Sequence, residues 1–210
     1  MSPEPTVFIV DDDANFSKSL VWLVESVGLR AECYRSAREF LGAYDPSRPG
    51  CLVLDMRMPE MGGLDLLDEF SARDIHIPVI VVTAYGDVPT AVRAMKSSAV
   101  DFLEKPFSHE ILLSRIQQCL EEDQQRRRKQ AVSAEIEQRL SLLTPRQREV
   151  MDLVVAGKSS KEIALQLCIS PKTVENHRIK LMKKMQVSNV VRLIAVVASL
   201  SQSEGNPLPL

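Results

Sequence analysis

Five short apolar runs rich in β-branched residues alternate with helical patterns over the first half of the chain, and this alternation limits the possible folds more than any other feature. The runs expected to form strands are Val7–Val10, Ala31–Tyr34, Cys51–Asp55, Val79–Thr83 and Asp101–Leu103. The expected helices lie near Ala14–Val27, Ser36–Ala43, Gly63–Ala72, Val88–Lys96 and His109–Leu120. Alternation at this spacing produces right-handed βαβ units, so the sequence predicts an α/β domain with a parallel sheet.

Polar side chains stand where these strands end. Asp11, Asp12 and Asp13 close the first run, and Asp55 closes the third. Because an open α/β sheet binds its ligands at the carboxyl ends of the strands, we expect these carboxylates to converge there. Converging carboxylates repel one another unless a hard cation neutralises them, and such oxygen ligands suit Mg²⁺.

Two more polar residues follow later strands. Thr83 closes the fourth strand and is followed by the small Ala84, and Lys105 follows the fifth strand. Taken singly, each site residue has a simpler explanation, such as a helix cap for Asp13, a turn for Thr83 and solvation for Lys105. Together, a hydroxyl, an ammonium and several carboxylates at one sheet edge predict a phosphate site.

Apolar residues of the first helix recur at intervals of three and four, which is typical of a helix face packed on a core. They are Phe16, Leu20, Leu23, Val24 and Val27, and we expect Trp22 in or near the same core. The cysteines Cys33, Cys51, Cys119 and Cys168 lie far apart, so we expect small buried residues in a reducing cytoplasm, not disulfides or zinc ligands.

Charge separates the two halves of the chain. Residues 1–120 carry 11 Lys and Arg against 18 Asp and Glu, a net −7, whereas residues 121–210 carry 15 against 10, a net +5. The basic half indicates a module with a polyanionic partner, with a merely solvated basic face as the alternative. The sequence has neither a signal-peptide pattern nor an apolar run long enough to span a bilayer, so we expect a cytoplasmic protein without a membrane partner.

A charged segment joins the halves. In Glu121–Gln130, acidic residues precede basic ones by about four positions, which stabilises a solvated helix. The basic cluster Arg126–Lys129 is explained better by helix solubility than by DNA contact. We expect residues 1–122 to form the first domain, 123–142 a helical linker that continues its last helix, 143–200 a second domain, and 201–210 a disordered tail.

Capping residues mark four helices in the second domain. The helices follow Thr144, Ser159, Ser170 and Ser188, and end near Gly157, Leu167, Met185 and Leu200. The second and third, joined by a short turn, predict a helix-turn-helix whose basic third helix suits a DNA major groove. The fourth carries a stripe of Leu193, Val197 and Leu200, which we expect to form a dimer face.

The first domain carries the motifs Val10–Asp13, Asp55–Pro59, Gly62–Gly63, Thr83–Ala84 and Asp101–Phe107. With these it resembles the receiver domain of bacterial response regulators. The resemblance implies a flavodoxin-like parallel sheet of five strands in the order 2-1-3-4-5. It also implies that Asp55 is the phospho-acceptor, and that Asp12 directly, Asp11 through water, Asp55 and the backbone carbonyl of Arg57 bind Mg²⁺ or Mn²⁺.

Further expectations come from the same resemblance. Thr83, Ala84 and Lys105 would bind phosphate, Thr83 and Phe102 would form a switch pair, and the Lys105–Pro106 bond would be cis. Phosphorylation would drive dimerisation through the surface of the fourth helix and fifth strand, which carries Arg93, Met95, Lys96 and Asp101. Ser98 stands where the family usually has Gly, so its effect on the switch is left open.

The segments Leu143–Val150, Gly157–Ala164 and Ser170–His177 resemble the LuxR/NarL-type DNA-binding domain. The two domains together are similar to FixJ-type response regulators. The resemblance implies a sensor histidine kinase, double-stranded DNA, a second copy of the chain and RNA polymerase as partners, and no enzymatic activity beyond weak self-dephosphorylation. The residues expected at DNA are Lys172, Thr173, Glu175, Asn176, His177, Arg178, Ile179, Lys180, Lys183 and Lys184.

Two other functions fit these residues less well. A phosphohydrolase with Asp55 as nucleophile would need a general acid two residues later, where Arg57 stands, and a cap domain for its substrate. A constitutive DNA-binding regulator would use the first domain only as a dimerisation scaffold, and the intact set of Asp11, Asp12, Asp55, Thr83 and Lys105 argues against this.

Overall fold

The computed structural model describes residues 4–84 and 99–203. The chain divides into two compact units, with the boundary between Arg127 and Arg128. Helix α5 (His109–Ser141) crosses this boundary and includes most of the expected linker. The predicted helix Val88–Lys96, the dimer-surface residues on it and Ser98 lie outside the described residues.

A five-stranded parallel sheet forms the centre of the first unit. Its strands are β1 (Thr6–Val10), β2 (Arg30–Tyr34), β3 (Gly50–Asp55), β4 (Val79–Thr83) and β5 (Ala99–Glu104). Their order is β2-β1-β3-β4-β5, as predicted. Every residue of β1, β3 and β4 is buried, because helices cover both faces of the sheet.

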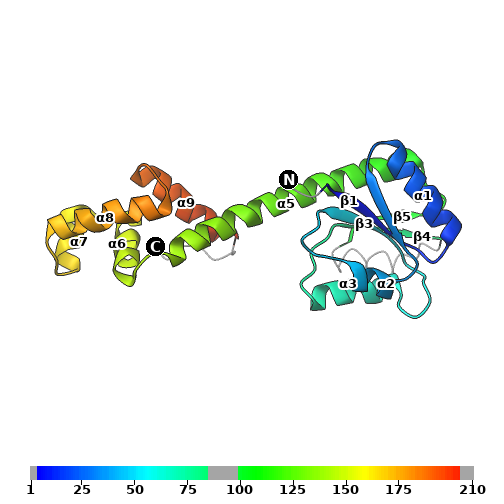
Figure 1. Ribbon diagram of the computed structural model, residues 1–210, viewed down its shortest axis with the longest axis horizontal. Coiled ribbons are helices and arrows are strands. Elements are labelled where there is room, and N and C mark those ends of the chain that lie inside the picture. The colour runs from blue at the N-terminus through cyan, green and yellow to red at the C-terminus, as the bar shows by residue number, and fades with distance from the viewer. Residues whose placement is uncertain (1–3, 85–98, 204–210) are drawn as a thin grey trace. The chain divides into compact units, whose positions relative to one another are not determined.

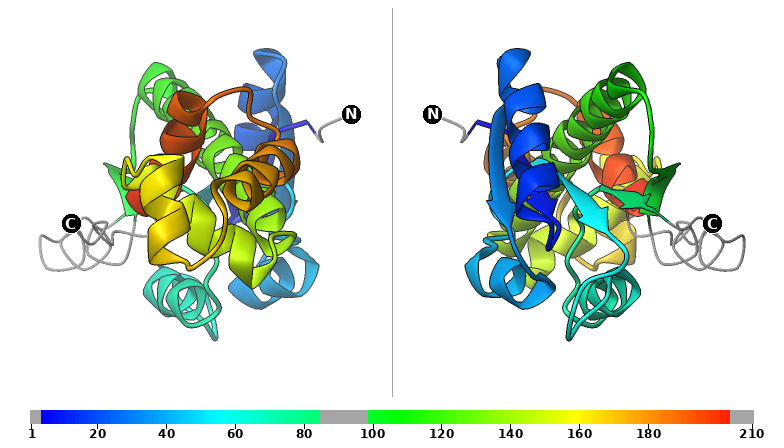
Figure 2. Two further views of the ribbon diagram at one scale, coloured as in Figure 1. Left: turned by 90° about the vertical axis from the view of Figure 1, so that its left-hand side faces the viewer. Right: turned by 90° about the vertical axis from the view of Figure 1, so that its right-hand side faces the viewer.

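Helices from the described part of the chain cover both faces of the sheet (Figures 1 and 2). Helices α1 (Ala14–Ser26) and α5 pack on one face, and α2 (Ala37–Ala43) and α3 (Gly63–Ala72) on the other. Alternate residues of β1 supply both cores, since Val7 and Ile9 face α1 and α5 whereas Phe8 and Val10 face α2 and α3.

The predicted core needs corrections. Trp22 is 74% exposed and Val27 is 52% exposed, whereas Leu20 and Val24 are buried. Trp22 follows Leu20 by two residues, which is about 200° around a helix, so it points away from the sheet that Leu20 contacts. Of the cysteines, Cys51 and Cys119 are buried as predicted, but Cys33 and Cys168 are exposed.

A second charged group lies at the amino ends of the strands. The Asp123 carboxylate on α5 is 1% exposed and accepts hydrogen bonds from the Gly50 amide at 3.0 Å, from Arg127 Nε at 2.7 Å and from Arg126. Arg127 also donates to the backbone carbonyls of the loop before β3. We call Asp123, Arg126, Arg127 and the Gly50 amide the Asp123 cluster.

The described part of the second unit contains the end of α5 and four further helices. These are α6 (Pro145–Val155), α7 (Ser160–Gln166), α8 (Pro171–Met185) and α9 (Val190–Ser203). The predicted caps are present, since the side chains of Thr144, Ser159 and Ser170 accept hydrogen bonds from amides in the first turns of α6, α7 and α8. The left-hand view of Figure 2 shows α7 in yellow and α8 in orange.

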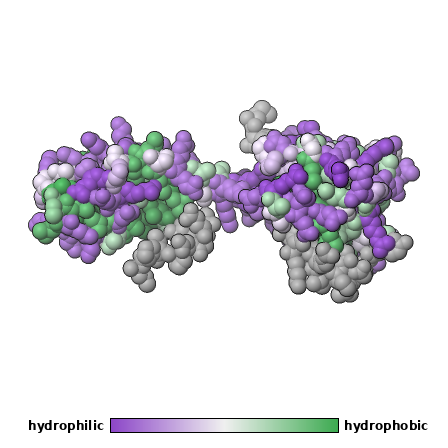
Figure 3. Space-filling model, turned by 90° about the horizontal axis from the view of Figure 1, so that it is seen from below, coloured by the Kyte–Doolittle hydropathy of each residue, from purple (hydrophilic) through white to green (hydrophobic). Residues whose placement is uncertain are grey.

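The α9 residues predicted to form a dimer face contribute to the core of their own unit, and dimerisation through α9 stays a prediction. Leu193 is fully buried, and Val197 and Leu200 pack against the same core, so this stripe anchors α9 within its own unit. Exposed large apolar residues of α9 include Val191 and Ile194. Figure 3 shows apolar areas beside hydrophilic ones on this unit's surface.

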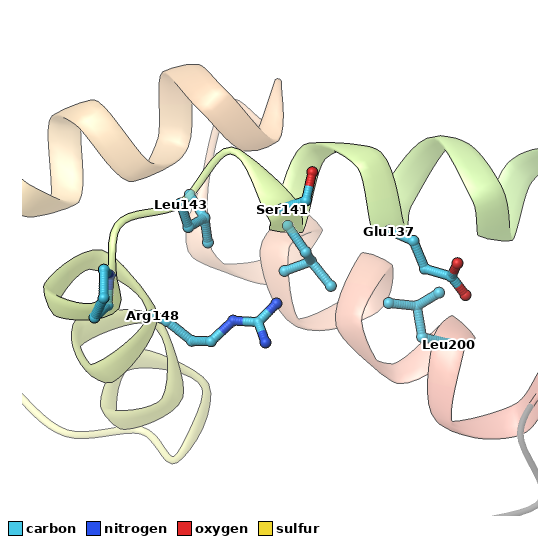
Figure 4. Close-up of a pocket in the computed structure, with 7 residues that line it drawn as sticks. Glu137, Ser141, Leu143, Arg148 and Leu200 are labelled. Carbon is cyan, nitrogen blue, oxygen red and sulfur yellow. The ribbon is translucent and has the colours of Figure 1, made fainter.

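A groove of about 710 Å³ lies within the second unit, between the end of α5, the start of α6 and α9. Its walls are mainly apolar, and the Arg148 side chain extends into it (Figure 4). Among the described residues, no helix is long and apolar enough to cross a membrane.

Candidate functional site

The predicted carboxylates lie together at the carboxyl ends of β1 and β3. The side chains of Asp11 and Asp55 are nearly inaccessible, and Lys105 Nζ lies 2.8 Å from Asp11 Oδ2 and 2.8 Å from Asp55 Oδ1. The ammonium of Lys105 therefore bridges two buried carboxylates. Each of the three residues is at least 44 positions from the other two in the sequence. We call Asp11, Asp12, Asp55, Thr83 and Lys105 the acidic site.

Backbone amides fix the other carboxylate oxygens. The Asp13 amide donates to Asp11 Oδ1 at 2.9 Å, and the Arg57 amide donates to Asp55 Oδ2 at 2.7 Å. The loop after β3 turns back closely over Asp55, and a Cβ atom at Gly63 would lie 2.8 Å from the Asp55 carbonyl oxygen. Glycine at this position therefore allows the close approach.

The remaining residues of this edge come from β4 and β5. Thr83 is buried, and its carbonyl accepts a hydrogen bond from the Lys105 amide at 2.7 Å. Ala84 is exposed beside it, and Phe102 is half-buried on β5. The Lys105–Pro106 bond is cis, as the resemblance implied.

An aromatic ring completes the surroundings of the lysine. Lys105 Nζ lies 3.9 Å from the centre of the Phe16 ring, a cation–π contact that sequence reasoning missed. The Phe16 ring in turn packs edge-on against Phe107. Residue spacing could not reveal this contact, because Phe16 fits the apolar pattern of α1 equally well.

Burial and charge act in opposite directions on the ionisable groups. Burial raises the pKa of Asp11 above its ordinary value, and the hydrogen bond from Lys105 offsets only part of this effect. Burial alone would lower the pKa of Lys105, but the hydrogen bonds to Asp11 and Asp55 raise it overall. The ammonium form of Lys105 is thus stabilised by its two carboxylate partners.

The donor set fits a hard divalent cation in its chemistry, because Asp11, Asp12, Asp55 and the Arg57 carbonyl all offer oxygen. Within residues 4–84 and 99–203, no three acidic, His or Cys side chains stand close enough to hold a metal ion as they are placed. Asp12 is exposed, and Lys105 lies between the other two carboxylates. Asp13 caps α1, accepting from the Asn15 and Phe16 amides.

Helix α8 presents the residues expected at DNA. Val174, Leu181 and Met185 are buried in the unit's core. The residues of α8 that are exposed include Lys172, Glu175, Asn176, Ile179, Lys180 and Lys183. Three other predicted residues, Thr173, His177 and Arg178, are half-buried at the edges of this face.

Lys184 differs from its neighbour Lys183. Its ammonium donates to the Leu142 carbonyl at 2.7 Å and to Gln147 Oε1 at 2.8 Å, so it joins the end of α8 to the start of α6. Lys183 is exposed. The expectation that Lys184 contacts a DNA phosphate remains a prediction. Lys183 is the simpler candidate for such a contact, because its ammonium is not bonded in this way.

Comparison with known proteins identifies both units. Residues 7–117 match the family described as response regulator receiver domain, and residues 141–197 match bacterial regulatory proteins of the luxR family. The chain belongs to the response regulators. It thus combines a two-component receiver with a LuxR-type helix-turn-helix domain and is a transcriptional regulator.

Similar proteins match along almost the whole chain. Nodulation protein W of Bradyrhizobium diazoefficiens is 41% identical, covering 96% of this chain and 89% of its own length. Transcriptional regulatory protein FixJ of Azorhizobium caulinodans is 40% identical, covering 94% and 95%. The solved structure of response regulator StyR is 40% identical with a TM-score of 0.88, covering 93% of this chain and 98% of that one.

Proposed function

We propose that the receiver takes a phosphoryl group onto Asp55 from a sensor histidine kinase in the cytoplasm, and that the phosphorylated chain dimerises and binds specific DNA sites. The observation that supports this most is the acidic site itself. Asp55 is buried at the carboxyl edge of β3, with Lys105 Nζ 2.8 Å from its Oδ1. Burying two carboxylates with only one ammonium between them costs free energy, and a purely structural role would not explain that cost.

In the proposed chemistry, Asp55 Oδ1 attacks phosphorus in line while the leaving group departs from the opposite side. Lys105 would move from the carboxylate to an oxygen of the incoming phosphoryl group, and the Thr83 hydroxyl would donate to another. Mg²⁺ or Mn²⁺, held by Asp11, Asp12, Asp55 and the Arg57 carbonyl, would supply neutralising charge. The product is an acyl phosphate. We expect the chain to accelerate hydrolysis of this acyl phosphate weakly and to have no other enzymatic activity.

Thr83 and Phe102 would report the phosphorylated state. Movement of the Thr83 hydroxyl toward phosphate would vacate space that the half-buried Phe102 ring can enter. We propose that this change alters the surface of β5 and the segment before it, and thereby favours a two-fold dimer.

The exposed face of α8 would enter the major groove. Glu175 and Asn176 offer an acceptor for cytosine and a bidentate partner for adenine, and Ile179 offers an apolar surface. Lys172, Lys180 and Lys183, with Thr173 and His177 beside them, would contact phosphates. RNA polymerase would be the partner of the DNA-bound dimer.

Intact-mass measurement tests the phosphorylation step. The purified chain is incubated with acetyl phosphate and Mg²⁺, and a matched sample contains a chelator instead of metal. We expect one added phosphoryl group per chain in the first sample and none in the second. An unmodified chain in both samples would favour a constitutive regulator, whereas rapid turnover of the donor without an adduct would favour a phosphohydrolase.

A further inference from the structure

The Ser160 hydroxyl on α7 makes hydrogen bonds to the first turns of α8. Ser160 Oγ lies 2.5 Å from Glu175 Oε1 and 2.8 Å from Arg178 NH1. Glu175 and Arg178 follow Ser160 by 15 and 18 positions in the sequence, so these contacts depend on the packing of the two helices. Sequence reasoning placed Glu175 and Arg178 at DNA but found no function for Ser160.

Hydrogen-bond chemistry fixes the direction of both contacts. A guanidinium can only donate hydrogen bonds, so Ser160 Oγ accepts from Arg178 and gives its single hydrogen to Glu175. Both bonds involve a charged partner and are stronger than bonds between neutral groups. The hydroxyl therefore connects a carboxylate and a guanidinium on adjacent turns of α8.

Helix capping does not require this hydroxyl. Ser159 is the N-cap of α7, and its side chain accepts from the Glu162 amide while Glu162 bonds back to the Ser159 amide. Ser160 is the first residue inside the helix, and both hydrogen bonds of its side chain go to α8. Its contacts thus concern the DNA-facing helix and not the stability of α7.

We propose that Ser160 is a positioning residue that determines sequence preference through Glu175. This inference rests on the proposed function of α8 as the DNA-reading helix. Glu175 is exposed, and without a partner its side chain would sample many rotamers. The Ser160 bond to Oε1 holds the carboxylate in one orientation and leaves Oε2 to accept from a base edge. Fixing a side chain before binding lowers the entropy cost of binding. This benefit arises only where the fixed side chain itself contacts a base.

The test compares base preference in full-length variants. A preferred duplex is first selected from a random library with the wild-type protein incubated with acetyl phosphate and Mg²⁺. Affinities are then measured for this duplex and for each of its single-base-pair variants. We expect Ser160→Ala to lower the preference at one base pair by roughly three- to tenfold, with the salt dependence of binding unchanged. Ser160→Thr, which keeps the hydroxyl, should retain the preference.

A double substitution identifies the partner. Glu175→Gln should reduce preference at the same base pair, and adding Ser160→Ala to it should change little, because the two residues act together. Equal weakening of all duplexes with a flatter salt dependence would overturn the inference and make Ser160 a phosphate contact. Unchanged preference in Ser160→Ala would overturn it as well. A wild-type protein that selected no sequence would overturn the proposed function itself.

Discussion

The two edges of the receiver sheet both hold buried carboxylates, but they satisfy them differently. At the carboxyl edge, Asp11 and Asp55 share a single ammonium from Lys105, and Asp12 stands exposed beside them. At the amino edge, the one carboxylate of the Asp123 cluster receives two guanidinium groups and a backbone amide. The carboxyl edge therefore has more carboxylates than cationic partners, whereas the amino edge has more cationic partners than carboxylates.

This difference teaches where to expect function. Charges whose partners all come from the protein are already paired, so adding a ligand there would break existing bonds. An excess of one sign favours a ligand of the other sign, which is the reason to propose a divalent cation at the carboxyl edge. The second unit repeats the contrast, since Lys184 is bonded within the protein and Lys183 is exposed.

The largest expected effect is at the acidic site. Asp55→Asn keeps the size of the side chain but replaces the nucleophile with an amide, so we expect phosphorylation by acetyl phosphate to be lost completely. Asp123→Asn is the matched control at the other edge and should still be phosphorylated at temperatures where it is folded. Full labelling of Asp55→Asn would show that another residue accepts the phosphoryl group.

The Asp123 cluster should matter for stability instead. Asp123→Ala leaves the Gly50 amide, Arg126 and Arg127 without their shared acceptor, so we expect the receiver to lose about 3 kcal/mol of unfolding free energy. Urea denaturation followed by circular dichroism measures this. A loss below about 0.5 kcal/mol would mean that the cluster resembles an ordinary surface ion pair.

Two adjacent lysines sharpen the comparison in the second unit. Lys184→Ala should lower the unfolding free energy by about 1–2 kcal/mol, because it removes charged hydrogen bonds to Leu142 and Gln147. Lys183→Ala should leave stability unchanged but reduce the slope of log affinity against log salt by about 0.9. The reverse assignment, with the slope change in Lys184→Ala alone, would contradict the distinction between bonded and exposed charges.

The smallest effect concerns acid stability. Hydrogen bonds from Arg48 lower the pKa of Glu32 from 4.5 to about 2. The folded state therefore gains stability above pH 4.5 and loses it as the pH falls toward 2. In the Glu32→Gln variant, the loss of unfolding free energy on acidification should be smaller by about 1 kcal/mol. This value takes account of solvent screening at a partly exposed ion pair. The check is urea unfolding at neutral pH and at about pH 3, where an unchanged pH dependence would exclude Glu32 as a contributor.

Local signals made much of this architecture predictable. Asp55 ends a β-branched run, and Thr144, Ser159 and Ser170 precede helices, so strand ends and caps could be located from neighbouring residues alone. The alternation of strands and helices predicted the parallel sheet, but the strand order and the roles of the acidic site depended on family resemblance.

Long-range contacts could not be predicted in the same way. Asp123 bonds an amide 73 residues away, and its sequence context is that of a solvated helix. Ser160 looked like part of a helix start, and its partners lie on another helix. Trp22 and Lys184 show a related limit, because apolar or basic character does not reveal the direction of a side chain until the helix is packed.

The central claim is that phosphorylation of Asp55 controls DNA binding by α8. The most direct measurement titrates a selected duplex with the full-length protein, with and without acetyl phosphate and Mg²⁺, beside Asp55→Asn under both conditions. We expect phosphorylation to tighten wild-type binding by about 5- to 150-fold and to leave Asp55→Asn unchanged. Equal affinity of phosphorylated and unphosphorylated wild-type protein would contradict the claim.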